Sequence, residues 1–171
     1  MLACGAGIFL AFCPKPPLCV NFSDSVAHGI YGTHPASAAK KDGYAVICLP
    51  EKTSSLAAER HYVKSRGDCA DGRGALLKRI AGTAGDFVSV SEKGISVNGK
   101  ILRDSAPMPA DGKGRPLPVF RMEERKLGEG EFIAYGDGDS GNSFDSRYFG
   151  PVSAESIRAA AEPLWVWGNN E

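Results

Sequence analysis

Short β-prone runs separated by turn residues follow one another from Gly43 onward, and this alternation constrains the fold most strongly. Asn98-Gly99 stands between two such runs, where Asn-Gly is a strong signal for a β-hairpin. The 21 glycines and 11 prolines also favour short strands and turns over a helical bundle. The expected strands are the runs 43–50, 74–82, 86–90, 95–97, 100–102, 131–136 and 163–168. We therefore expect a mainly β fold of short twisted strands with one or two short helices.

Two segments are expected to form short helices. The segment 53–65 offers Thr53 or Ser54 as an N-cap and has apolar residues at helical spacing. The segment 153–161, SAESIRAAA, is expected to form the second helix. Residues 104–118 are rich in proline and glycine, which predicts the longest surface loop there.

The length and charge of the chain limit its class. With 171 residues, the chain can bury a hydrophobic core as one domain. Its 20 lysines and arginines equal its 20 aspartates and glutamates, so its charge indicates neither a nucleic-acid partner nor an acidic-lipid surface.

The chain starts with an apolar segment, because residues 1–13 carry no charge and prolines follow directly. The segment is shorter than the roughly 20 residues of a membrane span and lacks the basic start of a secretory leader. We expect residues 1–19 to be the remnant of an export signal or membrane anchor, and residues 20–171 to form a single domain. A buried N-terminal strand or a misassigned start codon are the alternatives.

Two serines separated by a single residue, Ser23 and Ser25, are candidate catalytic residues. In an extended segment this spacing can place both hydroxyls on one side, so that one attacks while the other assists. His28 offers an alternative Ser-His pair with Ser25. Three residues along the same turn is poor geometry for that proton transfer.

Lys78 is a candidate general base. A strand period of two places it between Leu76 and Ile80 on one face of the run 74–82, where its ammonium group would lose its hydration. Burial lowers the pKa of a lysine from its usual value of roughly 10.4, and a neutral lysine can accept a proton from a serine. The alternative is a lysine that extends to water from a sheet edge.

The segment 135–152 places Asp145 two residues before Arg147, and the two side chains can brace a loop by charge-assisted hydrogen bonds. A calcium loop starting at Asp137 and Asp139 is a competing interpretation. Glycine stands where the fifth position needs Asp or Asn, and no flanking helices are expected. A solvated acidic turn is the other alternative. We expect no metal and no cofactor.

Three segments in this order resemble the signatures of the signal peptidase I superfamily, and within it the TraF-type peptidases of conjugative transfer systems. The segments are SVAHGIY with Ser25, LLKRIAGTAGD with Lys78, and NSFDSRYFGPV. TraF-type chains read Asn-x-Ser/Thr-x-Ser-x-Pro-x-Gly-Leu-Tyr at the nucleophile. The similarity covers about residues 20–167. This chain departs from the pattern at Ala27, where proline is usual, and at Val26, which is smaller than the usual neighbour.

The resemblance implies a signal peptidase/LexA-like β-fold and a Ser-Lys dyad. It makes Ser25 the nucleophile and Lys78 the general base. It pairs the Ser23 hydroxyl with the Ser25 backbone N–H in the oxyanion hole. It also assigns Ser143 to orienting the lysine and Asp145 and Arg147 to bracing the loop.

By the same resemblance, the substrate is an exported precursor such as a conjugative pilin. It would have small side chains before the cut, bind as an added strand near the membrane surface, and in some systems be cyclised. The enzyme would act at the periplasmic face of the inner membrane or in the periplasm, without nucleic acid. A general leader peptidase and a non-catalytic pilus-assembly protein are alternatives. A LexA-like self-cleaving repressor would need a DNA-binding helical domain and an Ala-Gly cleavage site, and neither is evident.

Cys48 and Cys69 flank the first expected helix. In an exported enzyme they could form a disulfide that closes a loop of about 20 residues, worth roughly 3 kcal/mol by chain entropy. Two ordinary free thiols are the alternative.

Overall fold

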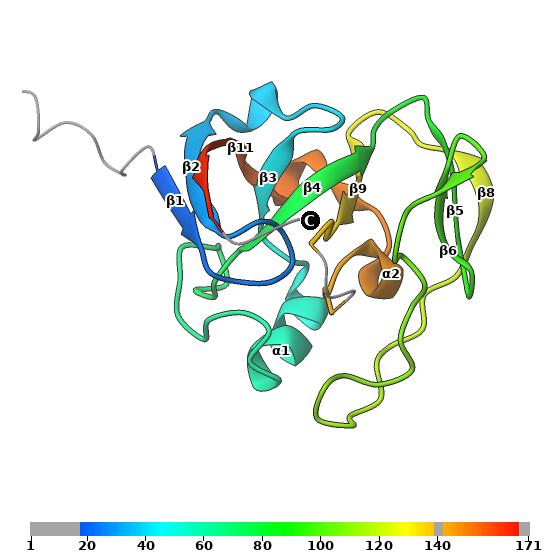
Figure 1. The fold of residues 1–171 in the computed structure, drawn as a ribbon, viewed down its shortest axis with the longest axis horizontal. Helices are drawn as coiled ribbons and strands as arrows, with labels where there is room; N and C mark the ends of the chain where they lie inside the picture. The colour runs from blue at the N-terminus through cyan, green and yellow to red at the C-terminus, as the bar shows by residue number, and fades with distance from the viewer. Residues whose placement is uncertain (1–17, 139–141, 168–171) are drawn as a thin grey trace, which may run out of the picture.

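The computed structural model describes residues 18–138 and 142–167, which form two antiparallel β-sheets and two short α-helices (Figure 1). The elements in chain order are β1 (Leu18–Asn21), β2 (Gly29–His34), η1 (Ala36–Ala38), β3 (Tyr44–Ile47), α1 (Glu51–Glu59), β4 (Leu76–Gly82), β5 (Phe87–Ser91), β6 (Gly94–Val97), β7 (Lys100–Ile101), β8 (Met122–Lys126), β9 (Glu131–Tyr135), α2 (Ser146–Phe149), β10 (Val152–Ser153), η2 (Ala154–Ser156) and β11 (Ile157–Val166). The mainly β expectation is confirmed.

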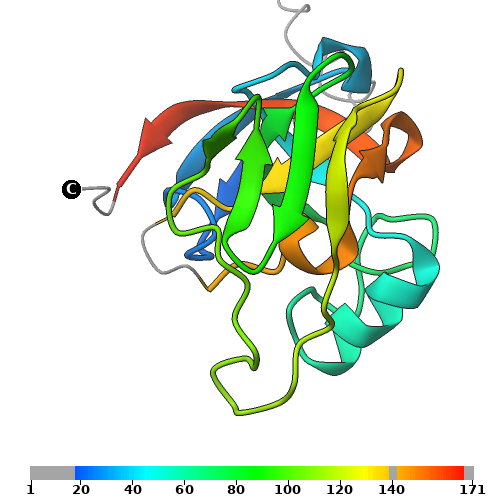
Figure 2. The ribbon, with the colours of Figure 1, turned by 90° about the vertical axis from the view of Figure 1, so that its right-hand side faces the viewer.

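The larger sheet has the strand order β1-β2-β11-β3-β4-β9-β10. The smaller sheet, β7-β6-β5-β8, faces the viewer in Figure 2. Buried side chains join the two sheets, since Ala81 of β4 and Ile133 of β9 belong to one cluster with Val88, Val90 and Ile95. The strand β4 therefore lies in the interior of the molecule, with neighbours on both of its edges.

The hairpin at Asn98-Gly99 is confirmed. Both residues have positive φ, 51° and 77°, as a type I′ turn requires, and β6 pairs with β7 across them. Residues 104–118 form a loop, as expected. Within it the structure has a single isolated bridge, between Ala110 and Pro116.

The prediction of a helix over residues 153–161 is wrong. A short 3₁₀ turn, η2, ends at Ser156, and β11 begins at Ile157. Ala160 and Ala161 each pair with β2 on one edge and β3 on the other. This position in mid-sheet supplies backbone partners on both sides, and tertiary pairing outweighs the helix propensity of alanine.

The first helix begins earlier than expected. Pro50 is the N-cap of α1, in place of Thr53 or Ser54, and the amide of Ser54 already donates to the Pro50 carbonyl at 2.8 Å. Proline is well suited to this end of a helix because it fixes φ and needs no N–H partner. The helix ends at Glu59, so Val63 lies beyond it.

The N-terminal boundary of the sheet falls at β1, which contains Leu18 and Cys19, two residues before the expected domain start at residue 20. The apolar segment 1–13 lies outside the described residues. Within residues 18–138 and 142–167, no helix has the length and hydropathy needed to cross a membrane.

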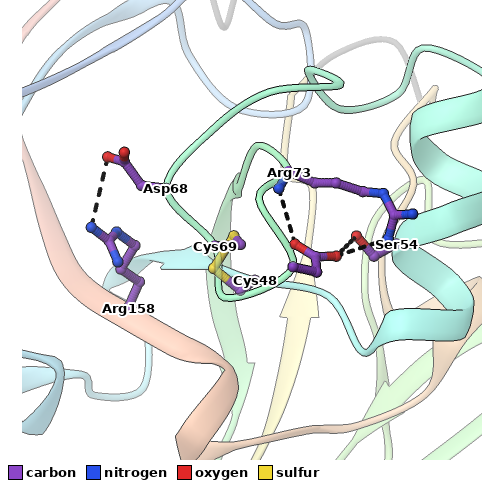
Figure 3. Close-up of a disulfide and its surroundings, with 7 residues drawn as sticks. Cys48, Ser54, Asp68, Cys69, Arg73 and Arg158 are labelled. Carbon is purple, nitrogen blue, oxygen red and sulfur yellow. Dashed lines mark hydrogen bonds and ion pairs between the residues drawn. A yellow bond between two sulfur atoms is a disulfide. The ribbon is translucent and has the colours of Figure 1, made fainter.

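A disulfide joins Cys48 and Cys69, which confirms that pairing (Figure 3). It fastens the segment after α1 to the end of β3. Asp71 attaches the same segment to α1, because its carboxylate accepts a hydrogen bond from Ser54 Oγ at 2.5 Å. The segment leads directly into β4, which carries Lys78, so these contacts help to position the lysine strand.

Candidate active site

Ser23 and Ser25 lie in the turn between β1 and β2 and not in an extended segment. The chain reverses here because β1 pairs antiparallel with β2, and only residues 22–28 connect the two strands. Ser23 is exposed and Ser25 is half-buried. Both hydroxyls are thus on the surface of a compact turn.

The segment Gly136–Gly138 packs directly against this turn. The Gly138 N–H donates to the Ser25 carbonyl at 3.1 Å. A Cβ atom at Gly138 would lie 2.0 Å from the Asp24 carbonyl oxygen, and one at Gly136 would lie 2.1 Å from Ser143 Oγ. Only glycine allows this approach of the backbones.

Asp137, between these glycines, makes side-chain contacts through its Oδ2 atom. Tyr44 Oη donates to its Oδ2 atom at 3.3 Å, and an Arg79 Nη1 atom lies 3.7 Å from the same oxygen. Burial raises the pKa of Asp137. The described part of the chain has no cluster of metal-ligating side chains, and Asp139 lies outside it.

Lys78 is buried, with 1% of its surface exposed, which confirms the expected burial and excludes the sheet-edge alternative. Its strand β4 lies between β3 and β9. Burial lowers the pKa of Lys78 from 10.5 to about 8. Lys78 Nζ donates to Ser143 Oγ at 2.9 Å. In the neutral amine this bond fixes the direction of the nitrogen and leaves its lone pair available to accept a proton.

Asp145 and Arg147 form a fully buried, bidentate ion pair, as expected for a bracing pair. Arg147 Nε and Nη2 lie 2.8 and 2.9 Å from the two carboxylate oxygens. The carboxylate also accepts from the Gly136 N–H at 3.0 Å, and the guanidinium donates to the Ser143 carbonyl at 3.1 Å. The pair therefore holds both Ser143 and the segment that packs against the serine turn.

One cavity of about 390 Å³ brings the expected site residues together: Ser23, Ser25, Lys78 and Ser143 all line it. Its apolar wall is formed by Leu76, Met108, Ala110, Leu117 and Phe144. A nucleophile of moderate accessibility, a buried amine and a second hydroxyl around one cavity are the groups that acyl transfer needs.

His28 is directed to another partner. Its Nε2 atom lies 3.0 Å from Asp24 Oδ1, and His28 is not among the described residues that line the cavity. The geometry gives no support to a Ser25-His28 pair.

Sequence reasoning missed residues that hold the site from behind. Tyr31 Oη donates to the Ala27 carbonyl at 2.7 Å, and the side chain of Asn21 contacts several groups of the serine turn. Tyr62 donates to Asp111, which holds the loop 104–118 against the cavity. An Asn two residues before Ser-x-Ser is a recognisable turn-forming signal. No sequence pattern predicts the two tyrosine contacts. Tyr62 and Asp111 are 49 residues apart, and the contact of Tyr31 with Ala27 depends on the conformation of the turn.

Comparisons with known proteins point to one family. The family model described as "Signal peptidase, peptidase S26" matches residues 27–167. The chain is 37% identical over 149 residues to a plasmid transfer protein TraF of Escherichia coli, covering 86% of this chain and 82% of the relative. It is 31% identical over 152 residues to a probable conjugal transfer protein TraF of Sinorhizobium fredii, covering 86% and 77%. It is also 33% identical over 90 residues to a probable signal peptidase I of Synechocystis, covering 51% and 36%.

Proposed function

Because this chain belongs to the signal peptidase family, peptidase S26, we propose that it is a serine endopeptidase with a Ser25-Lys78 dyad. The observation that carries the proposal is the cavity shared by Ser25 and a fully buried lysine whose pKa is lowered to about 8. At pH 7 a lysine with this pKa is neutral in about a tenth of the molecules, far more than a solvated lysine with a pKa of about 10.4, and the neutral form is the one that acts as a general base.

The proposed mechanism is acyl transfer. Neutral Lys78, oriented by Ser143, accepts the Ser25 proton while Ser25 Oγ attacks the scissile carbonyl. The Ser23 hydroxyl and the Ser25 N–H stabilise the oxyanion. Lys78 then protonates the leaving amine and activates the water that hydrolyses the acyl-enzyme. Asp145 and Arg147 keep Ser143 in place throughout.

The proposed substrate is an exported precursor of the pilin type, processed during conjugative transfer. The transfer proteins that this chain resembles over most of its length support that setting. The precursor would bind as an extended strand with small side chains before the cut. In an acyl-enzyme the attacking amine can also be the precursor's own, and the product would then be cyclic.

We place the enzyme at the periplasmic face of the inner membrane. Large exposed apolar side chains occur on β1, at the start of the serine turn and at the end of β11: Leu18, Val20, Phe22, Leu164, Trp165 and Val166, here called the apolar rim. The ring centroids of Phe22 and Trp167 lie 6.1 Å apart. The backbone N–H of Trp167 donates to the His28 carbonyl. Such a rim suits a membrane surface. The Cys48-Cys69 disulfide suits an oxidising compartment.

The test is cleavage of a pilin-type precursor by the purified protein, followed on gels and by mass spectrometry. Ser25→Ala and Lys78→Ala should each lower the rate by about 10³-fold or more while leaving the circular dichroism spectrum unchanged. Ser37→Ala and Lys126→Ala, at exposed positions elsewhere, are the matched controls and should cleave at the wild-type rate.

Two results would overturn the proposal. Cleavage retained by a folded Ser25→Ala or Lys78→Ala protein would exclude the dyad. A folded wild-type protein that leaves every precursor intact would favour the non-catalytic pilus-assembly alternative.

A further inference from the structure

Asn21 is a buried polar residue, 6% exposed, at the last position of β1 and immediately before the serine turn. Its amide nitrogen lies within hydrogen-bond distance of three backbone carbonyls, those of Ser23 at 2.9 Å, Val26 at 3.0 Å and Ala27 at 3.1 Å. Carbonyls can only accept, so these contacts fix which end of the amide is the donor. The turn is thus folded around the NH₂ group of one side chain.

The other end of the same amide contacts Ser23. Asn21 Oδ1 accepts from the Ser23 backbone N–H at 3.1 Å and from Ser23 Oγ at 2.8 Å. A serine hydroxyl carries one proton, and here it is donated to Asn21. The hydroxyl that would stabilise the oxyanion is therefore already occupied in the protein without substrate.

This arrangement suits an exchange of hydrogen-bond partners. When negative charge develops on the substrate oxygen, the Ser23 proton can turn to it, because a charged acceptor binds more strongly than an amide oxygen. Asn21 Oδ1 keeps the Ser23 N–H, so the exchange leaves no buried acceptor without a partner. The three carbonyl contacts hold the turn still while the proton changes partner.

We propose that Asn21 is a positioning residue for catalysis that acts through Ser23. It sets the Ser23 hydroxyl at the oxyanion hole and holds its proton until the transition state takes it. The inference rests on the proposed peptidase function and assigns a role to a residue outside the dyad.

The test is a double-mutant cycle between Asn21→Ala and Ser23→Ala, with kcat and KM measured on the precursor. Asn21→Ala should lower kcat at least about tenfold when Ser23 is present and less than about threefold in the Ser23→Ala background, with KM changed by less than about threefold in both. A residue that only shapes the turn would cause the same loss in both backgrounds.

Tyr31→Phe is the matched control. This substitution removes the hydroxyl that donates to the Ala27 carbonyl and leaves the buried ring in place. In the described structure, the hydrogen bond of the Tyr31 hydroxyl goes to Ala27 and not to the Ser23 hydroxyl. Its effect on kcat should be the same with and without Ser23. If Asn21→Ala does not fold, Asn21→Ser replaces it, since serine can still support a turn by accepting the Ser23 N–H but is too short to span the carbonyls.

Failure of the inference and failure of the proposed function give different results. Equal losses from Asn21→Ala, or its serine replacement, in both backgrounds would overturn the role of Asn21 while the Ser25-Lys78 dyad stands. Full activity of Asn21→Ala would overturn it too. Cleavage that survives Ser25→Ala would instead remove the function on which the inference rests.

Discussion

At the residue scale, the fold acts most directly on the charge of Lys78. Its pKa is lowered to about 8 because burial disfavours the ammonium form, and Arg147 adds to the effect while Asp145 opposes it. Since the base must be neutral, the rate of cleavage should rise with pH and level off above about 8. A pH profile of kcat/KM checks this. A rate that still climbs at about pH 10, near the pKa of a solvated lysine, would contradict it.

The same residue should reduce the stability of the protein. The folded-state pKa lies below the unfolded value of 10.5, so the folded protein binds fewer protons between about pH 8 and 10.5 and stability should rise with pH across that window. Below this pH window, burial of the charged Lys78 lowers the free energy of unfolding by about 3 kcal/mol, the value that corresponds to this pKa shift. Lys78→Met should therefore be more stable than the wild type at pH 7, by about 1–3 kcal/mol in denaturant unfolding. Equal or lower stability of Lys78→Met would show that the ammonium is well solvated or well paired.

How much of the site could be predicted differs from residue to residue. The burial of Lys78 follows from the period of its own strand, which is local information. The position of Ser143 beside its amine depends on a turn 65 residues away, so only the family resemblance suggested it. The contacts of Asn21 with three carbonyls depend on the conformation of the turn itself, which the spacing of Ser23 and Ser25 does not specify.

At the element scale, the disulfide controls how firmly α1 and the segment before β4 are attached. Cys48 and Cys69 are 21 residues apart, and cross-linking a loop of this size stabilises a fold by about 3 kcal/mol through the unfolded chain. Cys48→Ala with Cys69→Ala should lower the unfolding midpoint accordingly. Cys19→Ala is the control, since Cys19 lies outside the disulfide. Identical midpoints with and without a reductant in the wild type would contradict the prediction.

The secondary-structure elements also differ in how well the sequence predicts them. The β5-β6-β7 meander was predictable because Asn98-Gly99 and alternating apolar residues specify a hairpin locally. The strand β11 was predicted only at its end, where the expected run 163–168 overlaps it, because its alanine-rich start favours a helix in isolation. It becomes a strand only where β2 and β3 are both present to pair with it.

At the scale of the whole molecule, the apolar rim includes Phe22 of the serine turn, and Ser23 and Ser25 of the same turn line the cavity, so attachment of the rim to a membrane would bring a membrane-bound precursor near Ser25. We expect the protein to bind vesicles of phosphatidylethanolamine and phosphatidylglycerol. Phe22→Ser and Trp165→Ser should each weaken co-sedimentation by about tenfold, from the loss of one buried aromatic side chain. Phe87→Ser, an exposed aromatic residue on β5 outside the rim, is the control. Equal vesicle binding by all variants and the wild type would show that the apolar rim does not mediate membrane binding.

The place of β11 in the larger sheet has a consequence for the timing of activity. β11 follows all the other strands in the chain, yet it lies between β2, which follows the serine turn, and the pair β3-β4, which carries the lysine. A polypeptide that is still being translated, or threaded through a translocon, exposes Ser25 and Lys78 long before Val166 emerges. Until then the two halves of the sheet have no strand to join them. The proposed peptidase should therefore gain activity only after β11, the last strand of the described chain, has joined the sheet.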